Sequence, residues 1–294
     1  MKSARLYLSL VFGVVSVSFA AIFIRLADAP SLVIAAYRMS IAAAVITPFY
    51  LARSRGLPKG LRRRDILLVL LSAVLLAFHF GMWITSLEYT SIASSVVLAT
   101  SHPVFVAVLS YFLWRERLNR KAILGIAIAL GGVVTINYGG FALSPETIFG
   151  DMLALVSAAA IGIYLIIGRH LKERIRLLPY LSAVYGGAAL ILLTAALISG
   201  HSLAGYSVNT YLMFLLLALI PQLAGHTFLN QAVRLMPATI VSVAILGEPI
   251  GAIILGYMIL GEGITVIEAI GSILTLGGIS MVMLYQPKTD IIKV

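Results

Sequence analysis

Long apolar stretches follow one another along almost the whole chain, and only short breaks with charged or turn-forming residues separate them. A helix needs about 20 apolar residues to cross the hydrocarbon core of a bilayer. Stretches of this length exclude buried strands, and an open sheet would leave backbone groups unpaired in lipid. The sequence therefore predicts an all-α integral membrane protein. Its ten transmembrane helices are expected over residues 6–27, 31–52, 65–86, 91–113, 121–140, 151–169, 178–199, 210–232, 239–260 and 264–285.

Composition narrows the classes of function. Hydrophobic residues make up 61% of the 294 and charged residues 11%, whereas a typical soluble chain carries about 25% charge. This balance argues against a water-soluble enzyme, a secreted scaffold or a disordered regulator. The chain has no cysteine, which removes thiolate metal sites and thiol nucleophiles. It also lacks a Gly-x-x-x-x-Gly-Lys-Ser/Thr loop and the His-Glu-x-x-His and Gly-x-Ser-x-Gly motifs, so we expect no ATP motor, metal or cofactor.

The net charge of +10 is explained by where the charges lie. With the N-terminus in the cytoplasm and the spans alternating, all but two of the 21 Lys and Arg residues fall in cytoplasmic segments. The exceptions, Arg25 and Arg38, lie within or at the end of spans. The positive-inside rule then places both termini in the cytoplasm. We expect a multi-pass protein of the cell (inner) membrane that binds no nucleic acid, with Arg62–Arg64 facing anionic lipid headgroups.

The second half of the chain repeats the first at an offset of 146 residues. Residues 87–138 align with 233–284 without gaps, so that Pro103 meets Pro249 and Glu116 meets Glu262. Five helices per copy is an odd number, so the second copy enters the membrane upside down. Such inverted repeats are common in secondary transporters, whose site lies near the midplane between the halves. The expected division is a first repeat over 1–140, an outside linker over 141–150 and a second repeat over 151–294.

These motifs resemble the EamA-type members of the drug/metabolite transporter superfamily. Both halves carry a mid-helix proline, a Glu at the helix end and a glycine-bearing last helix, and Ala35-Ala36-Tyr37-Arg38-Met39 looks like the family's second helix. The resemblance covers essentially the whole chain and implies a transporter of amino acids, sugars, nucleotide conjugates or xenobiotics. The sequence departs from the family at Leu113-Trp114-Arg115-Glu116, where a Gly more often precedes the Glu. The glycines expected to allow close packing of each last helix are Gly125, Gly131, Gly132, Gly271, Gly277 and Gly278.

Glu248 gives the sharpest signal for a site. A charged side chain this far inside a span costs at least about 2.5–3.5 kcal/mol on insertion scales, so it faces a cavity or a partner, or is protonated. Pro249 cannot donate a backbone hydrogen bond, so it frees a carbonyl one turn earlier and kinks the helix. His102 and Pro103 take the equivalent positions in the first half. Binding of substrate or protons and plain helix packing remain open for Glu248 and His102.

Further candidates lie on the other spans. Arg38 keeps its charge, so it pairs with a carboxylate of the protein or with an anionic group of a substrate. His79 and Trp83 share a face with Phe80 and line an apolar pocket, unless Trp83 belongs to the outer aromatic belt. Gln222, His226 and Asn230 form a polar stripe that lines a cavity or bonds to neighbouring helices. Weaker pocket candidates are Tyr37, Tyr164 and Tyr185.

The sequence favours a secondary transporter with alternating access, and the family resemblance implies that it exports small metabolites such as amino acids or related compounds. Its two halves would rock around a central cavity, with Pro103 and Pro249 softening the gating helices. Glu248 and His102 permit proton coupling without requiring it. A lipid-directed intramembrane enzyme and a scramblase or channel are the alternatives. The expected partners are a small-molecule substrate and membrane lipids, and the choice between monomer and homodimer is open.

Overall fold

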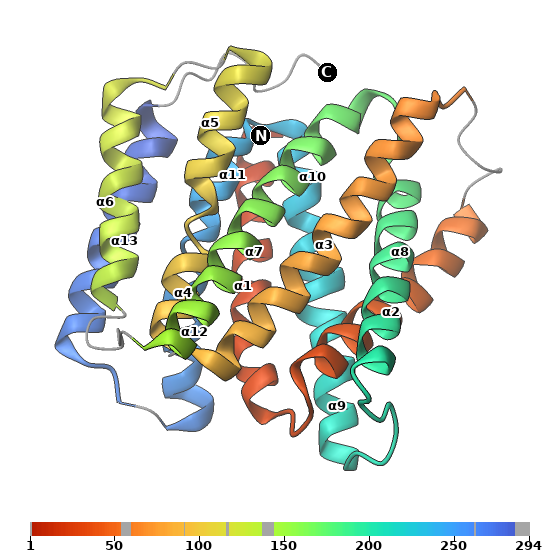
Figure 1. The fold of residues 1–294 in the computed structure, drawn as a ribbon. Coiled ribbons are helices and arrows are strands. Elements are labelled where there is room, and N and C mark those ends of the chain that lie inside the picture. Colours follow the sequence, from red (N-terminus) through yellow and green to blue (C-terminus); the bar gives the residue numbers. More distant parts are fainter. Residues whose placement is uncertain are drawn as a thin grey trace.

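A computed structural model describes residues 2–53, 60–90, 92–115, 118–136, 144–261 and 263–285. Every regular element in these ranges is helical (Figure 1). The α-helices are α1 (Lys2–Leu26), α2 (Ser31–Arg53), α3 (Arg63–Tyr89), α4 (Ile92–Ala99), α5 (His102–Trp114), α6 (Arg120–Ile136), α7 (Pro145–His170), α8 (Leu177–Ile198), α9 (Val208–Leu217), α10 (Thr227–Leu235), α11 (Ala238–Ile245), α12 (Glu248–Leu255) and α13 (Val266–Tyr285). A short 3-10 helix, η1 (Leu171–Glu173), follows α7, and π-helical segments form η2 (Ala218–His226) and η3 (Gly256–Leu260).

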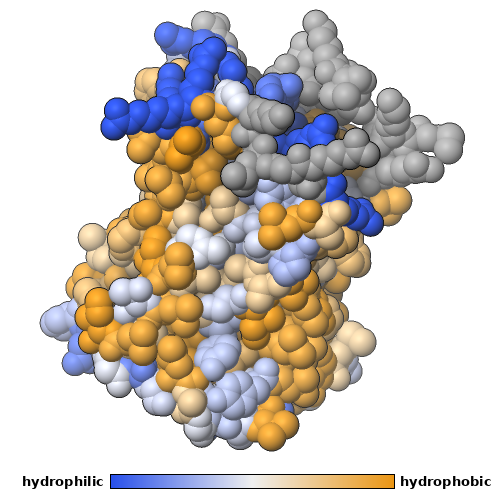
Figure 2. Space-filling model, turned by 90° about the vertical axis from the view of Figure 1, so that its right-hand side faces the viewer, coloured by the Kyte–Doolittle hydropathy of each residue, from blue (hydrophilic) through white to orange (hydrophobic). Residues whose placement is uncertain are grey.

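Within the described ranges, nine helical segments are long and apolar enough to cross a membrane. They match nine of the ten expected spans and establish a multi-pass membrane protein. The remaining expected span, 121–140, coincides with α6, whose described part is 17 residues long. Side chains on the outer surface are apolar, with Leu190 68% and Ile198 82% exposed. Figure 2 shows this apolar surface below a hydrophilic end, as expected for a protein whose solvent is lipid.

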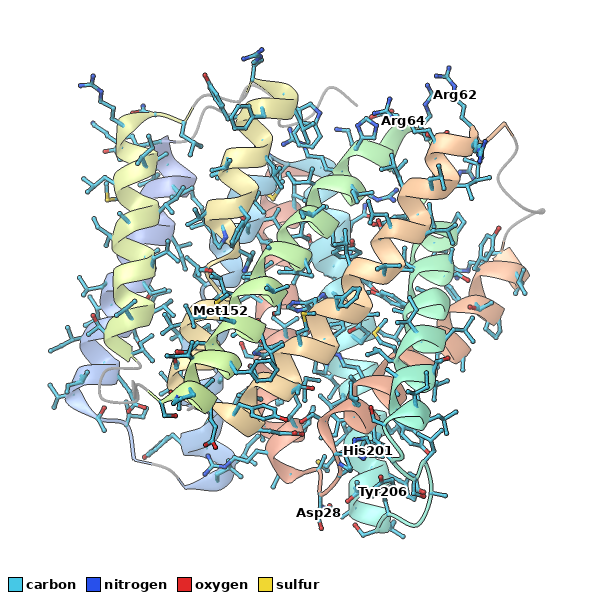
Figure 3. All side chains as sticks on the ribbon, in the orientation of Figure 1. Asp28, Arg62, Arg64, Met152, His201 and Tyr206 are labelled. Carbon is cyan, nitrogen blue, oxygen red and sulfur yellow. The ribbon has the colours of Figure 1, made fainter. Side chains whose placement is uncertain are left out.

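The two ends of the helix bundle differ in character. Arg62 and Arg64 lie at the end where α1 begins, whereas Asp28, His201 and Tyr206 lie at the opposite end (Figure 3). Glu116 and Glu262, the aligned acidic pair of the repeat, fall outside the described residues, as do 137–143 and the last nine residues.

The start of α7 differs from the sequence prediction. Residues 145–150 were expected in an outside linker, but they form the first turns of α7. The reason is a helix start that the polar residues encode: Ser144 Oγ accepts a hydrogen bond from the Thr147 backbone amide at 3.2 Å, and Pro145 takes the first helical position. Proline is favoured there because its missing N–H has no partner in the first turn.

Two spans are broken in the middle, at equivalent places. Residues 100–101 separate α4 from α5, and residues 246–247 separate α11 from α12. The same bounds recur in the second half at the 146-residue offset. The bounds of α4 recur in α11, those of α5 recur in α12 together with η3, and the start of α6 recurs as the start of α13. Each break carries a tightened i to i−3 hydrogen bond, from Ser101 to Leu98 at 3.1 Å and from Gly247 to Ala244 at 3.0 Å. The expected kinks before Pro103 and Pro249 are confirmed, and Figure 1 shows that the two broken spans run in opposite directions.

Helices α6 and α13 pack closely through four of the six predicted glycines. Gly125 faces the Gly278 carbonyl oxygen, and a side chain added there would approach it to 2.9 Å; Gly132 faces Gly271 and Thr275. Thr275 Oγ1 also donates to the Ala129 carbonyl at 3.4 Å. A side chain added at Gly131 or Gly277 would meet no atom within 4 Å, so the close-packing prediction is wrong for these two.

Candidate functional site

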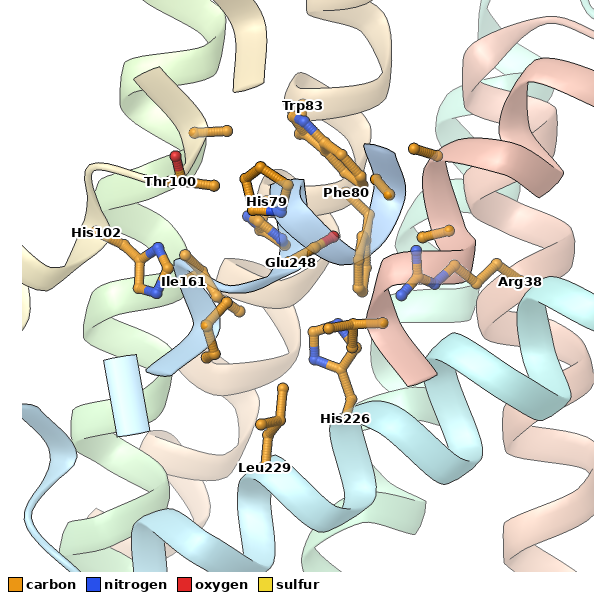
Figure 4. A pocket seen from close by; sticks show the side chains of 17 residues that line it. Arg38, His79, Phe80, Trp83, Thr100, His102, Ile161, His226, Leu229 and Glu248 are labelled. Atoms are coloured by element: carbon orange, nitrogen blue, oxygen red, sulfur yellow. The ribbon is translucent and has the colours of Figure 1, made fainter. Parts of the chain in front are cut away.

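A cavity of about 80 Å³ lies where the broken spans meet α1, α2, α3, α7 and η2 (Figure 4). A single water needs about 10–15 Å³ of such volume, so the cavity has room for a small solute. Its wall combines apolar surface with a few polar side chains, which is the usual composition of a small-molecule site. Among the described residues, no group of three or more His, Asp or Glu side chains is arranged to hold a metal ion.

Both helix breaks open onto this cavity. Ala99 and His102 line it from the first break, and Ile245, Glu248 and Pro249 line it from the second. His102 is the first residue of α5, and Glu248 is the first residue of α12. The positive end of a helix dipole lies at its N-terminus, and unwound backbone leaves carbonyls available to a ligand. The symmetry that the sequence predicted for His102 and Glu248 is therefore present in the geometry.

Arg38 is held in a fixed orientation at the other side of the cavity. It is 1% exposed, its Nε donates to Gln222 Oε1 at 2.9 Å, and its guanidinium carbon lies 4.0 Å from the centre of the Phe80 ring. Among the described residues, Arg38 forms no ion pair with Glu248. Figure 4 shows Arg38 and His102 on opposite sides, with Glu248 between them. One cavity thus contains a cation and a carboxyl group that are not bonded to each other.

Aromatic side chains of α3 form one wall. His79 stacks on Trp83 with ring centres 6.1 Å apart, and Phe80 meets His226 edge-on at 5.3 Å. His79 Nδ1 lies 3.1 Å from the Ser157 carbonyl oxygen and 3.2 Å from Ser157 Oγ, so both groups of Ser157 orient the ring. Trp83 lines the cavity, so its position agrees with the pocket interpretation more closely than with an outer belt.

Several polar atoms of these residues are buried without a hydrogen-bond partner. They are Arg38 Nη1, Trp83 Nε1, His102 Nε2 and, behind Arg38, Gln222 Nε2. Leaving a buried donor or acceptor unpaired costs about 1–3 kcal/mol, and few such groups occur in native proteins. Three of the four belong to side chains of the cavity wall, where a polar solute would supply the partners.

The polar stripe on the eighth span divides between two roles. Gln222 bonds to Arg38, and His226 lines the cavity. Asn230 accepts a hydrogen bond from the Tyr164 hydroxyl at 2.9 Å and donates to the His226 carbonyl at 2.7 Å. The stripe faces protein, as the sequence predicted. The π-helical form of residues 218–226 was not predicted, although such segments are frequent at functional sites.

The three tyrosine candidates do not line the cavity. Tyr164 and Tyr185 are fully buried in the surrounding core. Tyr37 stacks on Phe214 with ring centres 4.5 Å apart, and its hydroxyl donates to the Leu203 carbonyl. A buried tyrosine needs an apolar contact for its ring and a hydrogen-bond partner for its hydroxyl. Because a protein core supplies these two contacts as well as a pocket does, the sequence does not separate the two positions. Pro103 also lies behind the wall, whereas Pro249 is part of it.

Sequence reasoning missed the contribution of α1. Val17, Ala20 and Ala21 line the cavity from one face of that helix. The available signal was their spacing, since positions three and four apart share a helix face. Small side chains on a span also mark close contacts rather than lipid.

Helical spans that break beside a central cavity with a few polar side chains are typical of multi-pass membrane transporters. The model of the EamA-like transporter family matches residues 4–138 and again 148–284. The chain therefore belongs to the EamA-like transporter family, as the sequence motifs indicated.

Relatives support this class. YetK of Bacillus subtilis (strain 168), named an uncharacterized transporter, is 26% identical over 260 residues, which cover 86% of this chain and 78% of YetK. An uncharacterized transporter of Archaeoglobus fulgidus is 24% identical over 282 residues, which cover 95% of this chain and 96% of that transporter. A solved crystal structure, described only as that of a protein, superposes with a TM-score of 0.83 at 18% identity over 96% of this chain and 98% of its own. At that identity the structural likeness concerns the fold alone.

Proposed function

We propose that this protein is a secondary transporter that exports small zwitterionic metabolites, amino acids or related compounds, by alternating access. The observation that carries the proposal is the unbonded pair of Arg38 and Glu248 in one cavity, together with the unpartnered polar atoms around it. The export direction follows the family resemblance.

A zwitterion fits this arrangement for an electrostatic reason. A buried charge without a partner is costly, whereas a solute with a carboxylate and an ammonium group neutralises Arg38 and Glu248 at once. Arg38 offers an unpartnered nitrogen for the carboxylate, and guanidinium groups suit carboxylates geometrically. The apolar part of the solute would contact Phe80 and Trp83. The volume of about 80 Å³ favours a small side chain in this conformation.

The proposed topology completes the repeat. In it α6 also crosses the membrane, as the fifth of ten spans, the two halves are inverted five-helix repeats, and both termini lie on the cytoplasmic side of the cell (inner) membrane. The recurrence of element bounds at 146 residues supports this assignment, as does the position of Arg62 and Arg64 at the end of the bundle where α1 begins. Gating would arise at the two breaks, where Pro103 and Pro249 remove a backbone hydrogen bond and leave the spans easier to bend.

Counterflow uptake by proteoliposomes tests the transport proposal. We expect saturable uptake of an intact labelled neutral amino acid. The decarboxylated amine and the deaminated acid of the same side chain should each compete about 10–100-fold more weakly, because each loses one charged contact. Arg38→Gln and Glu248→Gln should impair uptake, with the exposed Arg176→Gln and Glu146→Gln as matched controls.

Three results would contradict this proposal. Equal competition by the amine and the acid would remove the zwitterion argument. A chemically altered product would point to the enzyme alternative, and flux that does not saturate would point to a channel or scramblase.

Proton coupling is tested separately through Glu248, the carboxyl group of the cavity wall. If Glu248 carries a proton during the transport cycle, Glu248→Gln abolishes the dependence on a pH gradient of the weakened uptake that remains at raised substrate concentration. The Glu146→Gln variant serves as control. An unchanged pH dependence in Glu248→Gln would exclude this residue as the coupling group.

A further inference from the structure

A second buried arginine lies away from the cavity. The sequence placed Arg234 in a cytoplasmic segment, but the structure places it in the last turn of α10 with only 8% of its surface exposed. Its Nη1 donates to the Ile175 carbonyl at 2.6 Å. Its Nε and Nη2 are buried and have no hydrogen-bond partner. Arginine keeps its charge in proteins, so this side chain presents a permanent cation with unused donors.

The two unused nitrogens matter because they form one edge of the guanidinium. The N–H groups of Nε and Nη2 point in the same direction, and this fork matches the two oxygens of a carboxylate. No acidic side chain among the described residues forms an ion pair with Arg234. The neighbouring Tyr180 hydroxyl already donates to Ser72 Oγ at 3.1 Å, and the Tyr164 hydroxyl already donates to Asn230.

Structural roles account for only part of this arrangement. A cation is favourable at a helix C-terminus, and the guanidinium carbon lies 5.1 Å from the centre of the Tyr180 ring. Both effects stabilise the charge of Arg234, and the bond to Ile175 uses one nitrogen. Neither provides an acceptor for the Nε and Nη2 edge, whose burial is costly unless a ligand satisfies it.

Arg234 is connected to the cavity by its own helix. Asn230 lies one turn before it and donates to the carbonyl of His226, which lines the cavity. Eight residues of helix separate Arg234 from His226, a rise of about 12 Å. Figure 1 places α10 towards the end of the bundle where α1 begins, and Arg234 lies in the last turn of that helix.

We propose that Arg234 is a second carboxylate-binding position, which holds the carboxylate of the transported solute between the cytoplasmic end and the cavity. The proposal rests on the proposed transport function. In it the carboxylate binds the Nε and Nη2 edge of Arg234 first, and then transfers to Arg38. In this proposal the position acts from one face of the membrane, because Arg234 lies at the end of α10 that faces the end of the bundle where α1 begins.

Side-resolved kinetics test this position. In proteoliposomes of known orientation, Arg234→Gln should raise the apparent KM from the α10-end face about 10–100-fold, the loss of one charged hydrogen-bonded contact. The KM from the opposite face should stay within about twofold. Arg234→Lys keeps the charge but not the fork, so it should recover only part of the affinity. The exposed Arg174→Gln is the matched control. An equal change on both faces, or no change with Arg234→Lys and Arg234→Gln both folded, would overturn the proposal.

A binding measurement separates this proposal from the transport function and needs no transported substrate. In the Arg38→Gln protein, acetate should raise the thermal stability more than chloride at equal ionic strength, because a ligand stabilises the state that binds it. The extra stabilisation should disappear in Arg38→Gln/Arg234→Gln. Equal stabilisation in both variants, or by chloride and acetate alike, would contradict a carboxylate position at Arg234. Wild-type protein that binds acetate at Arg234 but moves no amino acid would reject the transport proposal alone.

Discussion

The contact between α6 and α13 gives a sharp test, because two adjacent glycines face opposite ways. A methyl group added at Gly132 would lie 2.7 Å from the Gly271 carbonyl oxygen and in still closer contact with Thr275. A methyl group added at Gly131 would meet no atom within 4 Å. Carbon atoms attract best at about 3.5–4.0 Å, so the Gly132→Ala change must push the helices apart. Gly131→Ala is its matched control.

The expected difference follows from two terms. Replacing Gly by Ala in a helix gains up to about 1 kcal/mol in both variants, because alanine loses less backbone freedom. Overpacking costs about 1–3 kcal/mol, and only Gly132→Ala incurs it. We therefore expect Gly132→Ala to be about 1–3 kcal/mol less stable than Gly131→Ala. For a chain somewhat larger than 250 residues, each kcal/mol changes the Tm by about 2 °C, so the two Tm values should differ by about 2–6 °C.

The assay is thermal unfolding of both purified variants in the same detergent at the same scan rate, since unfolding of such a protein is governed by rates as well as equilibria. Gly278→Ala and Gly277→Ala form a second pair, because a side chain at Gly278 would collide with Ala129 whereas Gly277 is free of neighbours. Equal Tm values within each pair would refute the close approach of these two helices.

Two further predictions concern buried hydrogen bonds. Gln222→Leu removes the acceptor that orients Arg38 Nε. We expect the fold to stay unchanged and substrate binding, measured by counterflow competition, to weaken about 10–100-fold. Wild-type affinity would show that Arg38 needs no such support. Asn230→Leu leaves the fully buried Tyr164 hydroxyl unpaired and should destabilise the protein by about 1–3 kcal/mol, whereas the Tyr164→Phe/Asn230→Leu double variant should recover part of that loss. A double variant no more stable than Asn230→Leu in thermal unfolding would contradict the pairing.

Much of the fold was predictable because the bilayer restricts what a chain can form. Apolar length alone located nine of the spans. The prolines predicted both helix breaks, since a proline removes a specific backbone hydrogen bond. The start of α7 lies earlier than hydropathy predicts, because the Ser144 side chain accepts a hydrogen bond from the Thr147 amide and Pro145 favours the first helical position.

Only part of the candidate site could be predicted. Arg38, His102 and Glu248 were identifiable because an ionisable residue inside a span is costly wherever it lies. The tyrosines were not separable from core residues, since a phenol is satisfied equally well by a cavity or by a neighbouring helix. Which of Gly131 and Gly132 faces the neighbouring helix also depends on how the helices pack, and two glycines cannot be told apart by residue type.

The sequence by itself determined the class of solvent, the rough position of most spans and the family, because each depends on residues close together in the chain. The tertiary structure alone decided that Arg38 bonds to Gln222 rather than to Glu248 and that the two breaks share one cavity. It also buried Arg234 against Ile175. These contacts join residues up to 184 positions apart, and their geometry depends on how the helices pack against one another.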